Sequence, residues 1–182
     1  PESITFINQN AFNGYVCLSN VNIPDNVTLI GPQSFANCPS IKTLRMPPSI
    51  TKIDVRAFDN CTGLQDIQFS NNITIIEDSA FSRCYALQTV KLPSKLTYLG
   101  SHVFAHCCGL TEVIFNELIT AIGSYSFYNC SGLMEIGNLP EQLTCINRSA
   151  FELCSSLQYV KIPPCVTSLL NNSFAQCTGL TH

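Results

Sequence analysis

The repeating unit of this chain is clearest in residues 81–103, which read FSRCYALQTVKLPSKLTYLGSHV. Its opening phenylalanine recurs every 23 residues, with one interval of 24 between Phe127 and Phe151. The full column is Phe12, Phe35, Phe58, Phe81, Phe104, Phe127, Phe151 and Phe174. A fixed period of this length is typical of repeat proteins, in which each unit packs only against its neighbours. The sequence therefore predicts a single solenoid domain over residues 1–182, with about eight units.

Each unit contains two segments that favour β-strands. The first has the pattern L-x-x-V-x-L, as in residues 87–92, and alternates apolar and polar residues at its end as a half-buried strand does. The second is shorter and rich in β-branched residues, as in residues 73–76. Proline lacks an N–H for a sheet ladder, so the chain is expected to turn where five units place it (Pro24, Pro47, Pro93, Pro140 and Pro163).

The third part of each unit places Phe, Cys and Leu at positions i, i+3 and i+6. That spacing puts the three side chains on one side of a short helical turn. The predicted fold is therefore an α/β repeat solenoid, with a parallel β-sheet, short second strands and short helical turns.

The composition indicates a folded chain and names no charged partner. Hydrophobic residues make up 46% of the chain and charged residues 12%, which excludes a disordered segment. The formal net charge is -3 and no basic patch is present, so nucleic acid is not an expected partner. No stretch approaches the roughly 18 apolar residues that span a bilayer, so this segment is not expected to insert into a membrane.

Seven of the eleven cysteines form a second column: Cys38, Cys61, Cys84, Cys107, Cys130, Cys154 and Cys177. Side chains stacked in register point the wrong way for a disulfide torsion, and no C-x-x-C pair is present to hold zinc. We interpret the column as buried, reduced thiols. Cys17, Cys108, Cys145 and Cys165 lie in four different columns, so disulfides between them are not expected either. Many free thiols suit a reducing niche, which keeps an intracellular location open.

The histidine pair and the threonine column could each indicate a specialised binding site, but a structural or surface role explains both. His102 and His106 have a spacing that could place two imidazoles on one metal ion, but the column of His102 resembles an exposed variable face. A metal site is not predicted. The threonine column is interpreted as a structural ladder and not as an ice-binding array; it comprises Thr5, Thr28, Thr51, Thr74, Thr97, Thr120, Thr144 and Thr167.

The sequence contains no recognisable catalytic arrangement. The acidic residues are scattered, and neither a G-x-S-x-G motif nor a glycine-rich phosphate loop occurs. The chain is therefore predicted not to be an enzyme and to need no cofactor.

The unit C-x-x-L-x-x-V-x-L-P-x-x-L-T-x-I-x-x-x-A-F-x-x-C resembles the BspA-like, or Treponema-type, class of leucine-rich repeats. The resemblance covers nearly the whole chain, with Tyr15 in place of the column cysteine and Ser70 and Asn116 in place of the proline. It implies a right-handed coil with the first sheet on the concave face. It also implies a cell-surface or extracellular protein that adheres to host matrix proteins or host cells.

The outward positions of the first sheet vary from unit to unit while the framework repeats. They mix positive and negative side chains, which fits a protein ligand better than a polyanion. We call this predicted binding surface the first-sheet face; it comprises Asn20, Asn22, Thr43, Arg45, Asp66, Gln68, Thr89, Lys91, Glu112, Ile114, Glu135, Tyr159 and Lys161.

Two functional interpretations stay open. The first is an adhesive protein-binding module at the cell surface, and the second is a cytoplasmic interaction scaffold or structural spacer. Solenoids need terminal units with polar outer faces, and neither end of this sequence resembles one. The chain is therefore expected to be a fragment of a longer protein without its capping units.

Overall fold

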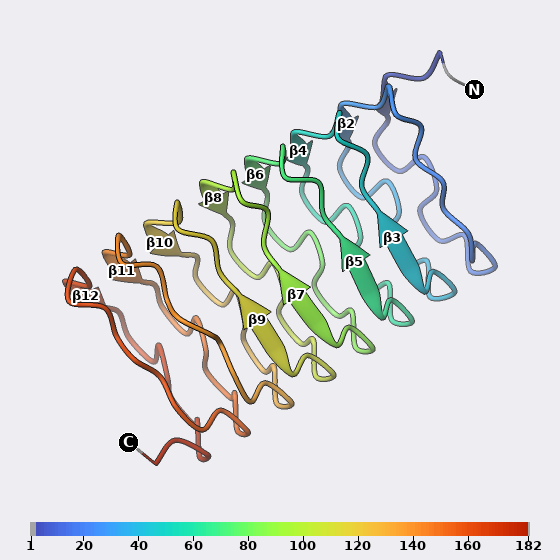
Figure 1. Ribbon diagram of the computed structural model, residues 1–182. Helices are drawn as coiled ribbons and strands as arrows, with labels where there is room; N and C mark the ends of the chain where they lie inside the picture. Colours follow the sequence, from blue (N-terminus) through green and yellow to red (C-terminus); the bar gives the residue numbers. More distant parts are fainter. Residues whose placement is uncertain (1–2, 182) are drawn as a thin grey trace.

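The computed structural model describes residues 3–181, which form an elongated β-solenoid of about seven turns (Figure 1). The repeat spacing is near 23 residues, as predicted, and the first and last coils lie at opposite ends of the stack. The predicted count of about eight units is not confirmed. The eight phenylalanines of the repeat delimit seven intervals, which accounts for the difference.

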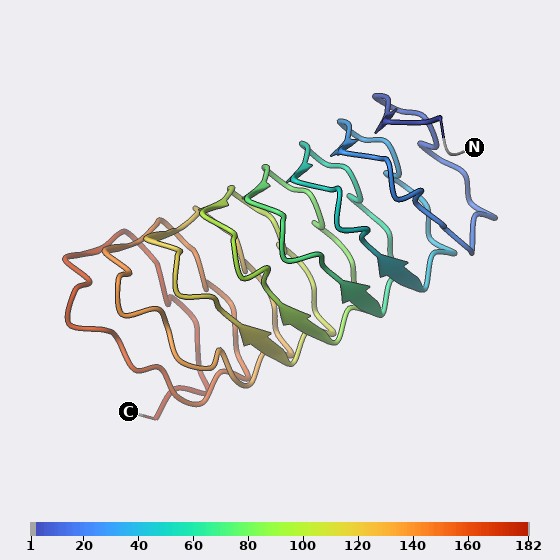
Figure 2. The same cartoon turned by 45° about the horizontal axis from the view of Figure 1, so that its top comes forward.

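Among the described residues, twelve strands of two or three residues form two rows along the stack (Figures 1 and 2). The first row contains β3 (Thr43–Arg45), β5 (Asp66–Gln68), β7 (Thr89–Lys91) and β9 (Glu112–Ile114). The second row contains β1 (Phe6–Ile7), β2 (Leu29–Ile30), β4 (Lys52–Ile53), β6 (Ile75–Ile76), β8 (Tyr98–Leu99), β10 (Ala121–Ile122), β11 (Cys145–Ile146) and β12 (Ser168–Leu169).

Every strand pairing is parallel and joins equivalent residues of adjacent coils. The partners are 23 residues apart in each pair except β10–β11, where the step from Ala121 to Cys145 is 24. This longer step follows the extra residue that the sequence places between Phe127 and Phe151. The prediction of parallel strands in register is therefore confirmed.

The third side of each coil is a run of turns, and the predicted helical turns are not confirmed because the described residues form no helix. Residues two before and two after the phenylalanine adopt a left-handed backbone, for example Ser79 and Arg83, each with φ of 59°. A left-handed residue breaks a right-handed helix. The N–H groups of Ser79, Phe81 and Arg83 instead donate to carbonyls of the next coil, at 2.8, 2.9 and 2.8 Å. Spacing alone does not distinguish this arrangement from a helix.

The phenylalanine column forms a continuous stack of rings through the core. Neighbouring ring centroids lie 5.0 to 5.6 Å apart, and the planes of Phe35 and Phe58 differ by only 1°. Phe58, Phe81 and Phe104 are fully buried, whereas Phe12 in the first coil is 37% exposed. Offset stacking of this kind adds to the stabilisation from burial, so the column fixes the spacing of the coils.

Polar side chains also link neighbouring coils. The Cys107 thiol donates to the Phe81 carbonyl at 3.3 Å, and the other column cysteines contact the phenylalanine of the preceding coil in the same way. The Thr97 hydroxyl donates to the Thr74 carbonyl at 3.2 Å, a contact that recurs along the threonine column. This repeated contact supports interpreting the threonines as a structural ladder.

Candidate functional site

Eight of the thirteen residues of the first-sheet face occupy the outer positions of β3, β5, β7 and β9. The central residue of each strand, such as Leu44, is buried and its two neighbours face outward. The register places Thr43 beside Asp66 and Arg45 beside Gln68, and pairs β7 with β9 in the same way. Because the strands are short and parallel, the face is a regular array of side chains on a fixed backbone.

The remaining five residues continue the array beyond the named strands. Glu135 pairs with Glu112 through an isolated parallel bridge. Asn20, Asn22, Tyr159 and Lys161 are exposed at the same positions of the outer coils. Because β3, β5, β7 and β9 lie in one row along the stack (Figure 1), the structure places the predicted residues of these strands on one side of the solenoid.

Charged side chains on this face have no ion-pair partner among residues 3–181. The ion pairs of that part of the chain join Lys52 to Asp54 and Glu77, and Arg83 to Asp59. On the first-sheet face, the one contact to a charged group is the hydrogen bond from Gln68 Nε2 to Asp66 Oδ2, at 3.5 Å. The face therefore presents unpaired charge to solvent, which suits binding and offers no arrangement for proton transfer.

The histidines with metal-ligand spacing lie in an aromatic cluster on the third side. The His102 ring stacks on Tyr125 at 4.7 Å, and His106 packs edge-on against Tyr128 at 5.3 Å. Asn129 Nδ2 donates to His106 Nδ1 at 3.1 Å. Partial burial lowers the pKa of both imidazoles. Within the described residues, no three His, Cys, Asp or Glu side chains are grouped so that they could hold a metal ion.

Sequence reasoning missed this aromatic cluster because its rings come from adjacent coils. The column of His102 reads as variable surface, and only the stacking of coils brings Tyr125 over it. The guanidinium of Arg148 lies over the Tyr125 ring, 5.9 Å from its centroid, within the range of a cation–π contact. His102 and Arg148 both contact this ring, so neighbours from two other coils pack against it.

The column cysteines are buried, as predicted, and their chemistry is that of inert thiols. Burial raises the pKa of the Cys61 thiol to about 12, and the pKa values of Cys84 and Cys107 are raised by the same cause. Only the thiolate is an effective nucleophile. These side chains therefore serve packing and hydrogen bonding, whereas Cys17 and Cys165 are exposed.

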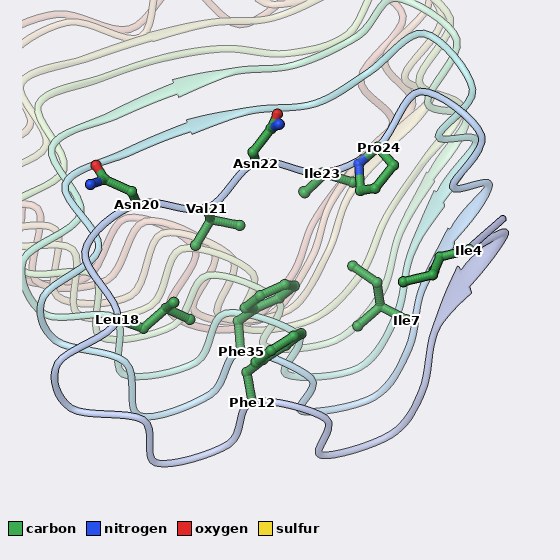
Figure 3. Close-up of a pocket in the computed structure, with 10 residues that line it drawn as sticks. All are labelled: Ile4, Ile7, Phe12, Leu18, Asn20, Val21, Asn22, Ile23, Pro24 and Phe35. Carbon is green, nitrogen blue, oxygen red and sulfur yellow. The ribbon is translucent and has the colours of Figure 1, made fainter. Parts of the chain in front are cut away.

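An apolar hollow of about 280 Å³ opens at the first coil and was not predicted (Figure 3). It is lined mainly by residues of the repeating core columns, including Ile7, Phe12 and Phe35. The amides of Asn20 and Asn22 point away from the two rings in Figure 3. Small-ligand sites combine an apolar lining with convergent polar groups, and this hollow is instead a continuation of the core.

The described residues include no helix that could cross a membrane.

Comparison with known proteins agrees with the geometry. The family model described as BspA type leucine rich repeat region (6 copies) matches residues 1–110 and 100–182. No curated protein matches the sequence. The T. pallidum leucine-rich repeat protein is similar in structure, with a TM-score of 0.84 and 27% identity, over 97% of this chain and 82% of that one.

Two further solved structures share the fold. The leucine-rich cell surface protein of Faecalibacterium prausnitzii has a TM-score of 0.51 and 23% identity, over 99% of this chain and 70% of its own. The pneumococcal vaccine antigen PcpA has a TM-score of 0.61 and 20% identity, over 91% of this chain and 50% of its own. Because the family model covers the whole sequence and the repeat columns build the observed coils, the chain belongs to the BspA-type leucine-rich repeat family.

Proposed function

We propose that this chain is a non-catalytic protein-binding module of a cell-surface protein, and that it adheres to host matrix or host cells through the first-sheet face. One contrast carries the proposal. The phenylalanine, cysteine and threonine columns repeat, whereas the first-sheet face changes from coil to coil and carries charges without ion-pair partners in the described chain. A rigid framework with a varied surface is the arrangement of a recognition scaffold.

The proposed location rests on what is said of similar proteins. The F. prausnitzii structure is described as a cell surface protein and PcpA as a vaccine antigen. Both share the fold of this chain, so we extend a surface location to it as part of the proposal.

The test is adhesion of the purified chain to immobilised matrix proteins (fibronectin, laminin and collagen) and to cultured host cells. The triple variant Asp66→Ala, Lys91→Ala and Glu112→Ala is expected to bind at least about tenfold more weakly, since each lost charge contact contributes up to about 1 kcal/mol. Its unfolding midpoint should not fall, because all three side chains point outward and removing Glu112 also removes the repulsion with Glu135.

The matched control changes three charges on the third side: Arg56→Ala, Arg148→Ala and Glu152→Ala. It should adhere like the unaltered chain. If the first-sheet variant adheres normally and the control variant does not, the binding surface lies on the third side and the proposed surface is wrong.

A second candidate is an intracellular scaffold or spacer, and the exposed free thiols of Cys17 and Cys165 favour it. Exposed thiols persist more readily in a reducing compartment. Antibody labelling of intact and permeabilised cells that express the full-length protein separates the candidates. Labelling of intact cells supports the surface module, and labelling only after permeabilisation supports the scaffold.

A further inference from the structure

Charges on the first-sheet face are sorted by sign into two rows. All charged residues at the first position of a strand, or at the equivalent position of another coil, are acids. All charged residues at the third position are bases. The acidic row contains Asp66, Glu112 and Glu135, and the basic row contains Arg45, Lys91 and Lys161. The two rows are separated by two residues along the strand, which is about 7 Å.

The rows are also staggered along the solenoid. In four successive coils the charge is basic at Arg45, acidic at Asp66, basic at Lys91 and acidic at Glu112. The strand register places each of these residues one coil beyond the one before it. Within these four coils like charges therefore recur every second coil and opposite charges alternate in a zigzag along the axis, which ends where Glu135 follows Glu112 on the next coil.

The arrangement is electrostatically unsatisfied within the described chain. None of these charged side chains has an ion-pair partner there. Glu112 and Glu135 are directly bridged neighbours on adjacent coils, and like charges in that position destabilise a sheet. A cationic group of a partner, placed over these two carboxylates, would remove the repulsion.

The spacing of the zigzag matches an α-helix laid along the solenoid axis. Coils are 5.2 to 5.6 Å apart at Phe58, Phe81 and Phe104 and about 4.8 Å apart where strands pair. Like charges two coils apart are thus about 9.6 Å apart where strands pair and up to about 11 Å apart at the phenylalanine column, and a helix rises about 10.5 Å in seven residues. The step of one coil between an acid and the next base corresponds to the rise of three or four helical residues. Residues three or four apart lie on the same face of a helix.

An extended strand fits this array poorly. Residues on one face of a strand recur about every 6.7 Å, which matches neither the single-coil step of about 4.8 Å nor the two-coil step of about 9.6 Å. A helix keeps register over several coils, and long Lys and Arg side chains absorb the small remaining difference.

We propose that the first-sheet face binds an α-helix of a partner protein in which acidic and basic residues alternate at intervals of three and four residues. The acids of the helix face Arg45 and Lys91, and its bases face Asp66 and the Glu112–Glu135 pair. This inference rests on the proposed function and specifies its partner class.

The test uses synthetic helical peptides of about three heptads, with Glu at the first and Lys at the fourth position of each heptad and alanine elsewhere. A peptide of the same composition with scrambled charge order, matched for helix content by circular dichroism, is the control. The patterned peptide should bind at low salt at least about tenfold more tightly than the scrambled one, and about 0.5 M salt should abolish the difference.

Variants with unchanged net charge test the sorting itself. Arg45→Glu with Asp66→Lys places both signs in each row and should weaken patterned-peptide binding about tenfold. Lys91→Glu with Glu112→Lys is an independent version of the same change. Making all four changes together inverts the zigzag of these four coils but keeps opposite signs alternating from coil to coil, and should restore binding. Arg56→Glu with Glu152→Lys, on the third side, should leave binding unchanged.

Equal binding of patterned and scrambled peptides, or full binding by the two mixed-row variants, would overturn the helix assignment. If the chain adheres to matrix proteins through the first-sheet face but ignores the patterned peptide, the helix partner is wrong and the proposed function stands. If the peptide binds and no matrix protein or host cell does, the helix partner stands and the proposed adhesion is wrong.

Discussion

Removing a ring from the phenylalanine column should cost far more in the middle of the stack than at its first coil. Phe81 is fully buried, with stacked rings 5.2 and 5.6 Å away and Phe69 edge-on at 5.5 Å. Burial of such a side chain contributes about 1.5–3 kcal/mol, and the cavity and lost ring contacts add to it. We expect Phe81→Ala to lower the free energy of unfolding by about 4 kcal/mol.

The equivalent change at Phe12 should cost only about 1–2 kcal/mol. Its ring is 37% exposed, stacks on Phe35 with centroids 5.0 Å apart and lines the apolar hollow. Solvent can enter the space that the ring leaves, so the cavity penalty is small.

Urea denaturation followed by circular dichroism measures both variants against the unaltered chain. Limited proteolysis adds a second measurement, because a break at Phe81 should expose central coils whereas a break at Phe12 should expose the first coil only. Equal losses of stability in the two variants would refute the view that each coil is stabilised by its immediate neighbours.

Three further predictions concern the thiols, the histidines and the left-handed positions. Iodoacetamide applied to the folded chain should modify Cys17 and Cys165 before Cys61, Cys84 and Cys107, whose pKa values burial raises; mass spectrometry locates the label. Burial lowers the pKa of His102 and His106 below their ordinary 6.5, so the unfolded chain takes up protons first as pH falls. Stability should therefore drop from pH 6.5 downward through the folded pKa values, and His102→Gln with His106→Asn should flatten that drop in thermal melts. Leu153 has φ of 66°, so Leu153→Asn should raise the free energy of unfolding by about 1 kcal/mol, whereas Leu153→Val should lower it.

The period of the sequence determined most of the fold in advance. Columns at fixed spacing require the coils to stack in register, so the strands, their parallel pairing and the buried Phe and Cys columns could all be predicted. The third side could not, because Phe, Cys and Leu at i, i+3 and i+6 suit both a helix and a run of turns. Asparagine at positions 37, 60 and 129 was the available signal, since it tolerates the left-handed backbone found there.

The candidate site could likewise be predicted only in part. Which residues face outward from the first sheet follows from strand alternation, and the structure places them on one surface. The stacking of His102 on Tyr125 and the hollow at Phe12 depend on side chains of neighbouring coils and on their conformations. The repeat spacing places His102 and Tyr125 on adjacent coils, 23 residues apart, but does not determine whether their rings stack or how open the first coil is.

The cysteine column has a structural role that bears on where the protein can reside. The Phe104 carbonyl accepts the N–H of Cys107 from its own coil at 3.2 Å and the thiol of Cys130 from the next coil at 3.1 Å. Alanine would lose the second contact, whereas cysteine supplies a weak donor on a small apolar side chain. Because burial raises the pKa of Cys84, Cys107 and Cys130, these central thiols stay protonated and resist oxidation even in an oxidising compartment. The column therefore does not argue against a surface location, and only exposed thiols such as Cys17 and Cys165 distinguish the two proposed locations.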